Sequence, residues 1–568
     1  MQTADKQLWQ RFLALAAPYW RGDEKWKAWG LLALLVILVL GQIRFAVLFN
    51  EQTGEFTSAL AARDEPRFWD AIKVCLGLLV AAVPIYAFYY YVRDKLGINW
   101  RRWLTSRFLD SYFGHRRFYE LNANDGIDNP DQRVAEDIAT FTQRSLYFLL
   151  VIVSSVLQLV AFSTVLWSIS RELVYFLIFY ASAGTLIVIF VFGQRLMTLN
   201  FNQLRREADF RFSLVRVREN AESIAFYRGE TQEMKQVKGR FGEAFANFNR
   251  LIRAQLSLNF FQHGYNLLTL VIPSAIVASR VLSGELEVGS AVQAAGAFAA
   301  VLSAISLIVE NFEGLSRFAA GIDRLDTLAK VLDGRQAVGQ AAANSTIRSV
   351  ESSRLALEDV TLHTPRYDRI LVRNLSVAVE PGEGLMIVGQ SGSGKSSLLR
   401  AIAGLWYSGS GTIFRPRPDD ILFLPQQPYM LLGSLRSQLL YPERAHLHSD
   451  DDLLELLEKV NLPDLARRFG GLGALQEWHK VLSIGEQQRL AFARLLLTRP
   501  RFAILDEATS ALDVPNELSL YGQLIETETT LISVSHRATI LKFHSQVLEL
   551  TGDSAWLARP AAGYRFDH

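Results

Sequence analysis

The residues with the most recognisable chemistry are the consecutive positions from Gly389 to Ser397, which read GQSGSGKSS. Gly389, four further residues, then Gly394, Lys395 and Ser396 reproduce the spacing of a phosphate-binding loop. Glycines let the backbone wrap closely, so that successive N–H groups point inward at phosphate oxygens. We expect the Lys395 ammonium to reach the β- and γ-phosphates and the Ser396 hydroxyl to bind Mg²⁺. The loop positions are Gly389, Gln390, Ser391, Gly392, Ser393, Gly394, Lys395, Ser396 and Ser397.

The stretches on either side of this loop supply the context that a phosphate site requires. Residues 385–388 (LMIV) predict a buried strand, and residues 397–405 predict a helix. The N-terminus of a helix favours an anion because its first backbone N–H groups are unpaired. A glycine-rich turn with a purely structural role is the alternative for this motif alone.

Further polar residues follow the loop in a fixed order. Residues 502–507 (FAILDE) predict a buried strand that ends in two acids. We expect Asp506 to hold Mg²⁺, directly or through water, and Glu507 to polarise an attacking water. Between the loop and this strand, residues 482–489 (LSIGEQQR) begin a helix. The remaining motif positions are Gln426 in LPQQPY, Asp513 in SALD and His536 in SVSHR.

Composition indicates membrane spans. Half of the 568 residues are hydrophobic and only 20% are charged, which is unusual for a soluble protein. Six apolar stretches, each near the roughly 20 residues that cross a bilayer as a helix, account for this excess. They are 29–49, 71–92, 146–169, 173–192, 258–278 and 290–312. The net charge of +2 gives no argument for nucleic acid, and the single cysteine, Cys75, excludes an internal disulfide and a cysteine metal cluster.

The distribution of Lys and Arg predicts the orientation of these spans. The N-terminal segment carries five, and the connections 93–145 and 194–257 carry nine and twelve. The other connections carry two, one and one. We therefore expect both termini and the two long basic connections on the cytoplasmic side, with the spans continuing as helices into the cytosol.

Two stretches lie at the expected tips of these connections. They are residues 127–138 (IDNPDQRVAEDI) and 219–230 (ENAESIAFYRGE). Pro130 and Gly229 punctuate helical patterns, which suits short helices at the ends of hairpins, and Gly229 is a candidate for a positive φ. The alternative is that Asp131, Arg133 and Asp137 only pair on a solvated surface.

Several other segments permit more than one interpretation. Residues 8–20 predict a helix that lies either on the membrane interface or on protein. Arg44 lies inside the first span and faces either the bundle interior or an interface, whereas Glu310 is expected to reach the cytoplasmic interface. Residues 335–350 read as a linker between a transmembrane domain, 1–334, and an α/β P-loop ATPase domain, 351–568.

The six ordered motifs resemble those of the ATP-binding cassette (ABC) ATPases over the whole of 350–568. The resemblance implies that two such domains stack head to tail and hold ATP between the loop of one and LSIGEQQR of the other. Ser483, Gly485 and Glu486 would then complete the site of the partner, and Asp513 would also bind nucleotide. Gln426 would link Mg²⁺ and water to the membrane domain, and His536 would contact the γ-phosphate.

The sequence departs from the common ABC pattern at two places. Ile484 stands where the signature motif usually has a second glycine, although Ser483 and Gly485 are kept. The aromatic residue that usually stacks on adenine is replaced by Thr364, and Tyr367 is the substitute that we consider. We nevertheless expect an active ATPase.

The membrane half resembles the subfamily D half-transporters, which include peroxisomal acyl-CoA and lysosomal cobalamin proteins. The resemblance rests on NPDQR (129–133), on ESIAFYRGE (222–230), where Ser223 replaces a common acid, and on GLW (404–406). The opening PYWRGDEKW (18–26) is closer to bacterial relatives that share a membrane domain with SbmA/BacA-type peptide-uptake proteins.

The resemblance implies an exporter-type fold of six transmembrane helices and a homodimer in a bacterial inner membrane, in contact with lipid. The expected activity is ATP-driven import of water-soluble cargo such as peptides or cobalamin-like compounds. Export of acyl-CoA, lipid or another amphipathic substrate is the alternative. A soluble ATPase that acts on DNA or ribosomes would lack the spans, and a receptor or channel that uses ATP only as a ligand would not need Glu507 and His536.

Overall fold

The computed structural model describes residues 2–122, 127, 129–310, 312–333, 346–442 and 448–566. These residues form two compact units. The first comprises residues 1–115 and 129–333, and the second comprises 116–128 and 334–568. The segment 116–128, which the sequence places in the membrane half, therefore clusters with the C-terminal half.

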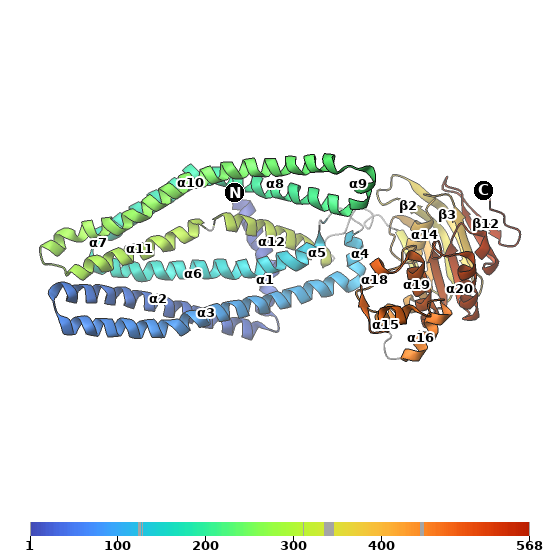
Figure 1. Ribbon diagram of the computed structural model, residues 1–568, viewed down its shortest axis with the longest axis horizontal. Coiled ribbons are helices and arrows are strands. Elements are labelled where there is room, and N and C mark those ends of the chain that lie inside the picture. The colour runs from blue at the N-terminus through green and yellow to red at the C-terminus, as the bar shows by residue number, and fades with distance from the viewer. Residues whose placement is uncertain are drawn as a thin grey trace. The chain divides into compact units, whose positions relative to one another are not determined.

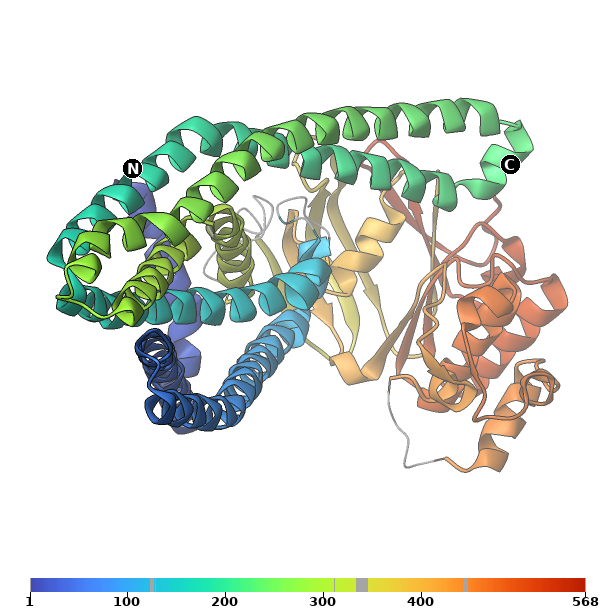
Figure 2. The same ribbon diagram turned by 60° about the vertical axis from the view of Figure 1, so that its left-hand side comes forward.

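The first unit is helical (Figures 1 and 2). Its long helices are α1 (Gln2–Arg21), α2 (Lys25–Ala62), α3 (Glu65–Phe113), α6 (Ile138–Ile169), α7 (Arg171–Ile187), α8 (Gln194–Glu219), α10 (Glu230–Leu282), α11 (Val288–Glu310) and α12 (Phe312–Leu332). Its short elements are α5 (Pro130–Gln132), the π-helices η2 (Arg133–Asp137) and η3 (Val188–Gly193), and α9 (Ala221–Tyr227). Six of the described helices are long and apolar enough to cross a membrane, which confirms the six predicted spans.

Small residues bring α2 and α11 into close contact. A Cβ built on Gly289 would lie 1.8 Å from the Gly54 carbonyl oxygen, so only glycine permits this approach. The Gly289 N–H donates to Ser58 Oγ at 3.0 Å. Interhelical contacts of this kind hold membrane helices together because lipid provides no hydrophobic driving force between them.

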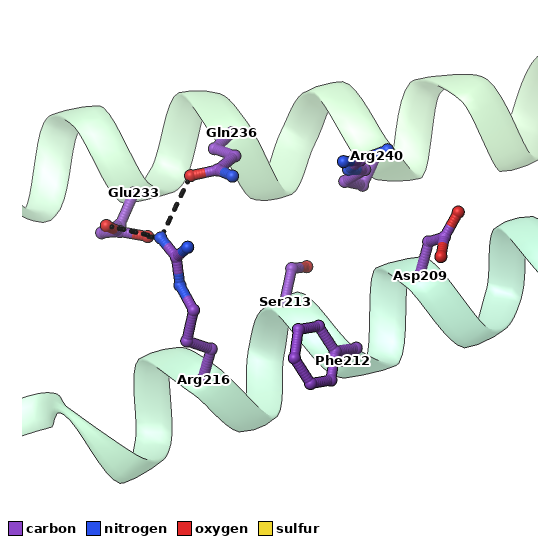
Figure 3. A pocket seen from close by; sticks show the side chains of 7 residues that line it. All are labelled: Asp209, Phe212, Ser213, Arg216, Glu233, Gln236 and Arg240. Atoms are coloured by element: carbon purple, nitrogen blue, oxygen red, sulfur yellow. Dashed lines mark hydrogen bonds and ion pairs between the residues drawn. The ribbon is translucent and has the colours of Figure 1, made fainter. Parts of the chain in front are cut away.

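The helices α8 and α10 run side by side, and α9 closes the hairpin (Figures 1 and 2). Near this end, Arg216 of α8 pairs with Glu233 at 3.1 Å and bonds to Gln236 at 3.3 Å (Figure 3). The hollow between the two helices has a volume of only about 150 Å³. Gly229 has a φ of −86° and Arg228 a φ of +53°, so the left-handed residue of this turn is Arg228 and the expectation for Gly229 was wrong.

The second unit contains two sheets that pack on each other and on helices. The strands are β1 (Thr346–Glu351), β2 (Leu355–His363), β3 (Ile370–Val379), β4 (Leu385–Gly389), β5 (Gly409–Arg415), β6 (Ile421–Leu424), β7 (Gly433–Ser434), β8 (Leu475–Gln476), β9 (Phe502–Asp506), β10 (Thr530–Val534), β11 (Gln546–Leu550) and β12 (Trp556–Pro560). The larger sheet has the order β12-β11-β4-β10-β9-β6, and the smaller has β1-β5-β2-β3. A separate two-stranded antiparallel sheet pairs β7 with β8, which lie far apart in sequence.

The helical elements of this unit follow the strands. They are η1 (Gly114–Arg116), whose first two residues belong to the first unit, α4 (Arg117–Asn122), α14 (Lys395–Ile402), η4 (Pro418–Asp420), α15 (Leu435–Leu440), α16 (Asp450–Lys459), α17 (Leu465–Phe469), α18 (Trp478–Val481), α19 (Ile484–Thr498), α20 (Val514–Glu526) and η5 (Ala538–Phe543). The helix after the phosphate loop thus covers 395–402 rather than 397–405, and β1 occupies 346–350 of the expected linker. Residues 334–345 lie outside the described residues.

The central strands of the larger sheet are buried on both faces. Along β4, Met386 and Val388 pack into one hydrophobic cluster, whereas Leu385 and Ile387 pack into another. This alternation follows from the two-residue repeat of a strand. Burial on both sides explains why β4 and β9 are continuously apolar in sequence.

Candidate functional site

Four strand ends meet at one edge of the larger sheet. The strands β4, β10, β9 and β6 are parallel neighbours, with Val534 opposite both Ile387 and Asp506, and Leu424 opposite Leu505. Parallel strands of this kind place their carboxyl ends together, where α/β proteins bind ligands. The phosphate loop, His536, Glu507 and Gln426 therefore follow adjacent strands although they are far apart in sequence.

The loop after β4 has the backbone that its glycines predict. Gly389, Gly392 and Gly394 have φ values of +142°, +80° and +100°, a region that L-residues with a Cβ rarely adopt. A Cβ on Gly389 would also lie 2.3 Å from the Leu550 carbonyl oxygen. The loop is exposed at Gln390 and Ser391.

Lys395 is folded into this loop. Its Nζ donates to the carbonyl oxygens of Gly389 at 2.7 Å and Gln390 at 2.9 Å. Burial lowers the pKa of Lys395, and the nearby Glu507 and Asp506 oppose that shift. Among the described residues, the buried Ser393 hydroxyl has no hydrogen-bond partner. A buried hydroxyl without a partner is costly, and a phosphate oxygen at the loop would satisfy it.

The side chain of Ser396 lies near the carboxylate of Asp506 at the end of β9. Burial raises the pKa of Asp506, and the Ser396 hydroxyl opposes the shift. An oxygen pair of this type suits Mg²⁺, which takes one or two protein oxygens and completes its shell with water and phosphate. Within the described residues there is no cluster of three or more His, Cys, Asp or Glu that could hold a metal.

Glu507 lies next to Asp506 and contacts two of the predicted site residues. Gln426 Nε2 donates to Glu507 Oε2 at 2.9 Å, and His536 Nε2 lies 3.7 Å from Glu507 Oε1. Glu507 has a φ of +47°, and its N–H donates to the carbonyl oxygen of Val534 at 3.0 Å. The chain thus leaves the strand conformation directly after β9, in a left-handed region that is uncommon for non-glycine residues.

Comparison with known proteins identifies the family. The profile of "ABC transporter transmembrane region 2" matches residues 16–282, and that of "ABC transporter" matches 372–510. An ABC transporter ATP-binding protein of Synechocystis sp. is 49% identical, over 95% of this chain and 82% of the relative. The chloroplastic ABC transporter D family member 2 of Arabidopsis thaliana is 40% identical, over 96% and 86%. The human lysosomal cobalamin transporter ABCD4 is 30% identical, over 97% and 96%.

The chain belongs to the ABC transporters, among the half-transporters of the D family. It is a multi-pass membrane protein with an ATPase domain that binds ATP and drives transport. The prediction of six transmembrane helices joined to a P-loop ATPase domain is thereby confirmed.

The signature helix of this ABC transporter is capped within its own chain. The Ser483 hydroxyl accepts from the Glu486 N–H at 3.3 Å, and the Ser483 N–H donates to Glu486 Oε2 at 2.8 Å. Burial acts to raise the pKa of Glu486, but its ion pair with Arg468 and its bonds to Ser483 outweigh burial and lower it. Gly485 packs beside Ala511, because a Cβ there would lie 3.1 Å from the Ala511 carbonyl oxygen.

Other predicted positions of the ABC site have local partners. Asp513 caps α20, accepting from the Asn516 N–H at 3.1 Å. In the described part of the chain, no hydrogen bond or ion pair joins residues 482–489 to the loop 389–397. Thr364 and Tyr367 lie in the β2–β3 turn, where the Tyr367 ring is 5.0 Å from that of His363. Adenine stacking on Tyr367 stays a prediction.

Sequence reasoning missed one contact of the ABC transporter ATPase domain. Arg116, the last residue of η1 directly before α4, donates from Nη1 to the Ala403 carbonyl oxygen at 3.3 Å. The Tyr407 hydroxyl lies near Glu120 of α4. Burial raises the pKa of Tyr407, and Glu120 adds to the shift. The GLW motif (404–406) drew attention to this region of the chain. Neither that motif nor the sequence of 116–122 predicts that the two segments contact each other.

Proposed function

We propose that this half-transporter acts as a homodimer in a bacterial inner membrane and imports water-soluble cargo such as peptides or cobalamin-like compounds. Two observations carry the proposal together. Gln426 and Glu507 are bonded at the ends of the parallel strands, as an ATPase site needs. The signature segment 482–489, in contrast, makes no described hydrogen bond or ion pair with the phosphate loop 389–397 of the same chain. A second copy would supply that segment. Export of acyl-CoA, lipid or another amphipathic compound is the competing direction and substrate class.

Exposed aromatic residues support assembly with a second copy. On α9, the side chains of Phe226 and Tyr227 are 78% and 87% exposed. Farther along the same hairpin, Phe212 and Phe241 are 70% and 52% exposed. Apolar surface of this extent at a cytoplasmic hairpin, beyond the predicted spans, indicates a protein partner. Closed two-fold symmetry is the simplest arrangement that completes both ATP sites at once.

Each site residue receives a role under this proposal. Lys395 and the backbone N–H groups of 389–397 hold the β- and γ-phosphates, and Ser396 and Asp506 hold Mg²⁺, with Gln426 beside them. Bound Mg²⁺ would neutralise phosphate charge. Glu507 orients and deprotonates the attacking water, and His536 donates to the γ-phosphate. Ser483, Gly485 and Glu486 close the site of the partner subunit, and Asp513 flanks it.

Coupling is proposed to pass through α4 as well as through α9. Arg116, Glu120 and Tyr407 connect α4 to the end of α14, the helix that begins at Lys395. A displacement of the loop on ATP binding would therefore reach the connection between α3 and α6. This role belongs to 116–122 rather than to the neighbouring NPDQR motif.

The NPDQR motif is instead packed on α12. Arg133 is 6% exposed, and its Nη1 donates to the Arg324 carbonyl oxygen at 2.8 Å. The Asp137 carboxylate pairs with the Arg324 guanidinium at 3.2 Å. Because α12 ends at Leu332, directly before the proposed linker 335–350, we infer that the motif fixes the helix leading from the transmembrane domain, 1–334, toward the ATPase domain, 351–568.

Location and direction rest on separate arguments. The excess of Lys and Arg in 93–145 and 194–257 supports cytoplasmic termini, and the 49% identity to a Synechocystis protein supports a bacterial origin. The printed name of the human relative assigns cobalamin to that protein and suggests the cargo class here.

Transport into proteoliposomes tests the proposal. Cobalamin, a peptide library and acyl-CoA are placed separately inside or outside vesicles, and ATP is supplied on the side of the ATPase domains. Import predicts that ATP expels a soluble cargo from the vesicle interior toward the ATPase side, and that Glu507→Gln abolishes this movement. ATP-dependent movement of acyl-CoA away from the ATPase side would establish the export alternative.

A further inference from the structure

A hollow lies at the corner where α1 ends, α2 begins and both approach α3. Its volume is about 490 Å³, and its lining includes Glu24, Arg102, Trp103, Ser106, Arg107 and Asp110. Neither the ATP site nor the proposed coupling contacts use these residues. We call this region, residues 21–27 with 101–111, the α1–α3 corner.

The lining residues of α3 form two adjacent rows on the helix, because positions four apart share a face. Arg102, Ser106 and Asp110 form one row, and Trp103 and Arg107 lie on the next. Arg102 pairs with Glu24 at 3.1 Å, and the guanidinium of Arg107 lies 5.7 Å from the centre of the Trp103 ring. A guanidinium carries five N–H donors, so each arginine keeps donors for a further acceptor.

From the start of the apolar stretch on α2, we expect the hollow near the level of the lipid headgroups. The helices α2 and α3 form an antiparallel hairpin whose turn lies at residues 63–64. Lys25 lies 38 residues before Arg63, and Arg102 lies 38 residues after Asp64. Lys25 and Arg102 are therefore at similar heights on this hairpin. The apolar stretch of α2 begins at Trp29, four residues from Lys25, or about 6 Å nearer the bilayer centre at 1.5 Å per residue.

Exposed tryptophans mark the same level. The side chains of Trp26 and Trp29 are 80% and 54% exposed, as expected for rings in the interfacial belt of a membrane protein. Next to the corner, the rings of Tyr19 and Trp100 stack at 5.7 Å, and Tyr19 also lies 5.7 Å from Trp103. The predicted leading helix therefore packs on protein while its junction with α2 faces the interface.

The corner is positively charged. Its six basic residues outnumber its three acidic residues, for a net charge of +3. The basic residues are Arg21, Lys25, Lys27, Arg101, Arg102 and Arg107, and the acidic ones are Asp23, Glu24 and Asp110. Basic clusters next to membrane spans attract anionic lipids, at about 1 kcal/mol per Lys or Arg near the surface.

We propose that the α1–α3 corner binds the phosphate of an anionic phospholipid, in the leaflet on the side of the long basic connections. Arg107, held over Trp103, and Arg102, held by Glu24, donate to the phosphate oxygens, and Ser106 lies between them on α3. The exposed rings of Trp26 and Trp29 flank the acyl chains. A zwitterionic lipid adds a cation that the positive corner disfavours.

Native mass spectrometry of the full-length protein, titrated with phosphatidylglycerol, tests this site. The variant Arg102→Ala/Arg107→Ala removes both donors. We expect its affinity for phosphatidylglycerol to fall about 25-fold, or about five-fold per arginine. Phosphatidylcholine should bind more weakly than phosphatidylglycerol, and its affinity should not change in the variant. Inorganic phosphate at millimolar concentration should not displace the lipid.

The matched control is Arg101→Ala, which removes the same charge from the neighbouring position. Arg101 donates to the Ala135 carbonyl oxygen at 3.4 Å and does not line the hollow. Because Arg101 adds to the charge of the corner but does not line the hollow, its removal should lower the affinity for phosphatidylglycerol by less than the about five-fold expected for each lining arginine. Wild-type affinity in the double variant, an equal loss in Arg101→Ala, or displacement by inorganic phosphate would each refute the lipid site. If the Arg102→Ala/Arg107→Ala variant fails to assemble, Arg102→Gln/Arg107→Gln takes its place, because glutamine keeps much of the side-chain length. Its affinity for phosphatidylglycerol is then compared with those of the wild type and Arg101→Ala.

Discussion

The side-chain amide of Gln426 donates a 2.9 Å hydrogen bond to Glu507, across the ends of two parallel strands, β6 and β9. These residues are 81 positions apart in sequence. The bond holds the carboxylate beside Asp506 and uses the NH2 group of the amide, so it is the side-chain carbonyl oxygen of Gln426 that could bind Mg²⁺ or accept from a water. The relationship makes the role of Glu507 testable.

Glu507→Gln should reduce ATP turnover by about 10²–10⁴-fold while ATP binding persists, because the variant keeps the shape of the side chain and loses the base. Single-turnover hydrolysis and nucleotide binding are measured on the same preparation. The control is Glu526→Gln, at an exposed position of α20. Near-normal turnover in Glu507→Gln would remove this residue from its proposed role.

Ser483→Arg should inactivate the ATP site of the partner subunit rather than its own. Mixed with Lys395→Ala subunits, it should form heterodimers in which one site carries both defects and the other is intact. Hydrolysis by the mixture should therefore exceed that of either homodimer. Ser483→Thr, which keeps the capping hydroxyl, serves as control. A mixture no more active than the single variants would contradict composite sites that act independently.

Arg116→Ala combined with Tyr407→Phe should weaken coupling, because it removes the Arg116 bond to Ala403 and the Tyr407 hydroxyl beside Glu120. We expect basal ATP hydrolysis to remain and its stimulation by cargo to be lost. Arg417→Ala, at an exposed position outside this contact, should leave stimulation intact. Full stimulation in the double variant would show that α4 does not transmit the signal.

Gly229→Pro should disturb the tip formed by α9 although its φ of −86° is close to what proline adopts. The Gly229 N–H donates to the Ile224 carbonyl oxygen at 3.0 Å, and proline removes that donor. Gly229→Ala keeps the donor, and a Cβ there has no contact closer than 3.8 Å. Cargo-stimulated hydrolysis should fall for proline only. An equal fall for alanine would show that side-chain bulk, not the hydrogen bond, matters.

His544 should make the protein sensitive to acid. It is 7% exposed and bonds to Ser533 Oγ and the Ile540 carbonyl oxygen at 2.9 Å each, and burial lowers its pKa to about 4. The unfolded chain, with a pKa of about 6.5, binds more protons between these values, so stability falls as the pH falls from about 6.5 to about 4. The loss between pH 7.5 and pH 5 should be about 2 kcal/mol.

Thermal unfolding of the full-length protein measures this effect. His544→Gln lacks the titrating group and should show a smaller decrease in melting temperature between pH 7.5 and pH 5 than the wild type. His448→Gln, at a half-buried position outside this contact, is the control. Identical pH dependence in His544→Gln and the wild type would mean that other groups control acid sensitivity.

Local patterns predicted much of the ATPase unit. The predicted strands 385–388 and 502–507 each lie within one residue of β4 and β9, and the six spans follow from apolar stretches long enough to cross a bilayer. The capping box at Ser483 is a purely local signal. The prediction of a positive φ at Gly229 was wrong. The sequence of a helix–helix turn does not specify which residue adopts the left-handed conformation, and here that residue is Arg228.

The sequence by itself determined which residues bear phosphate chemistry, because Gly389, Lys395 and Ser396 must be adjacent along the chain to wrap one anion. It also determined the spans. A transmembrane helix satisfies its backbone hydrogen bonds within the helix itself, so sufficient length and apolar side chains are enough to predict it. Only the tertiary structure decided that β10 lies between β4 and β9, which brings His536 and Glu507 to the same edge. It likewise decided that α4 lies against Ala403 and Tyr407. Strand order and docking are set by burial between distant segments, and no local pattern encodes which segments those are.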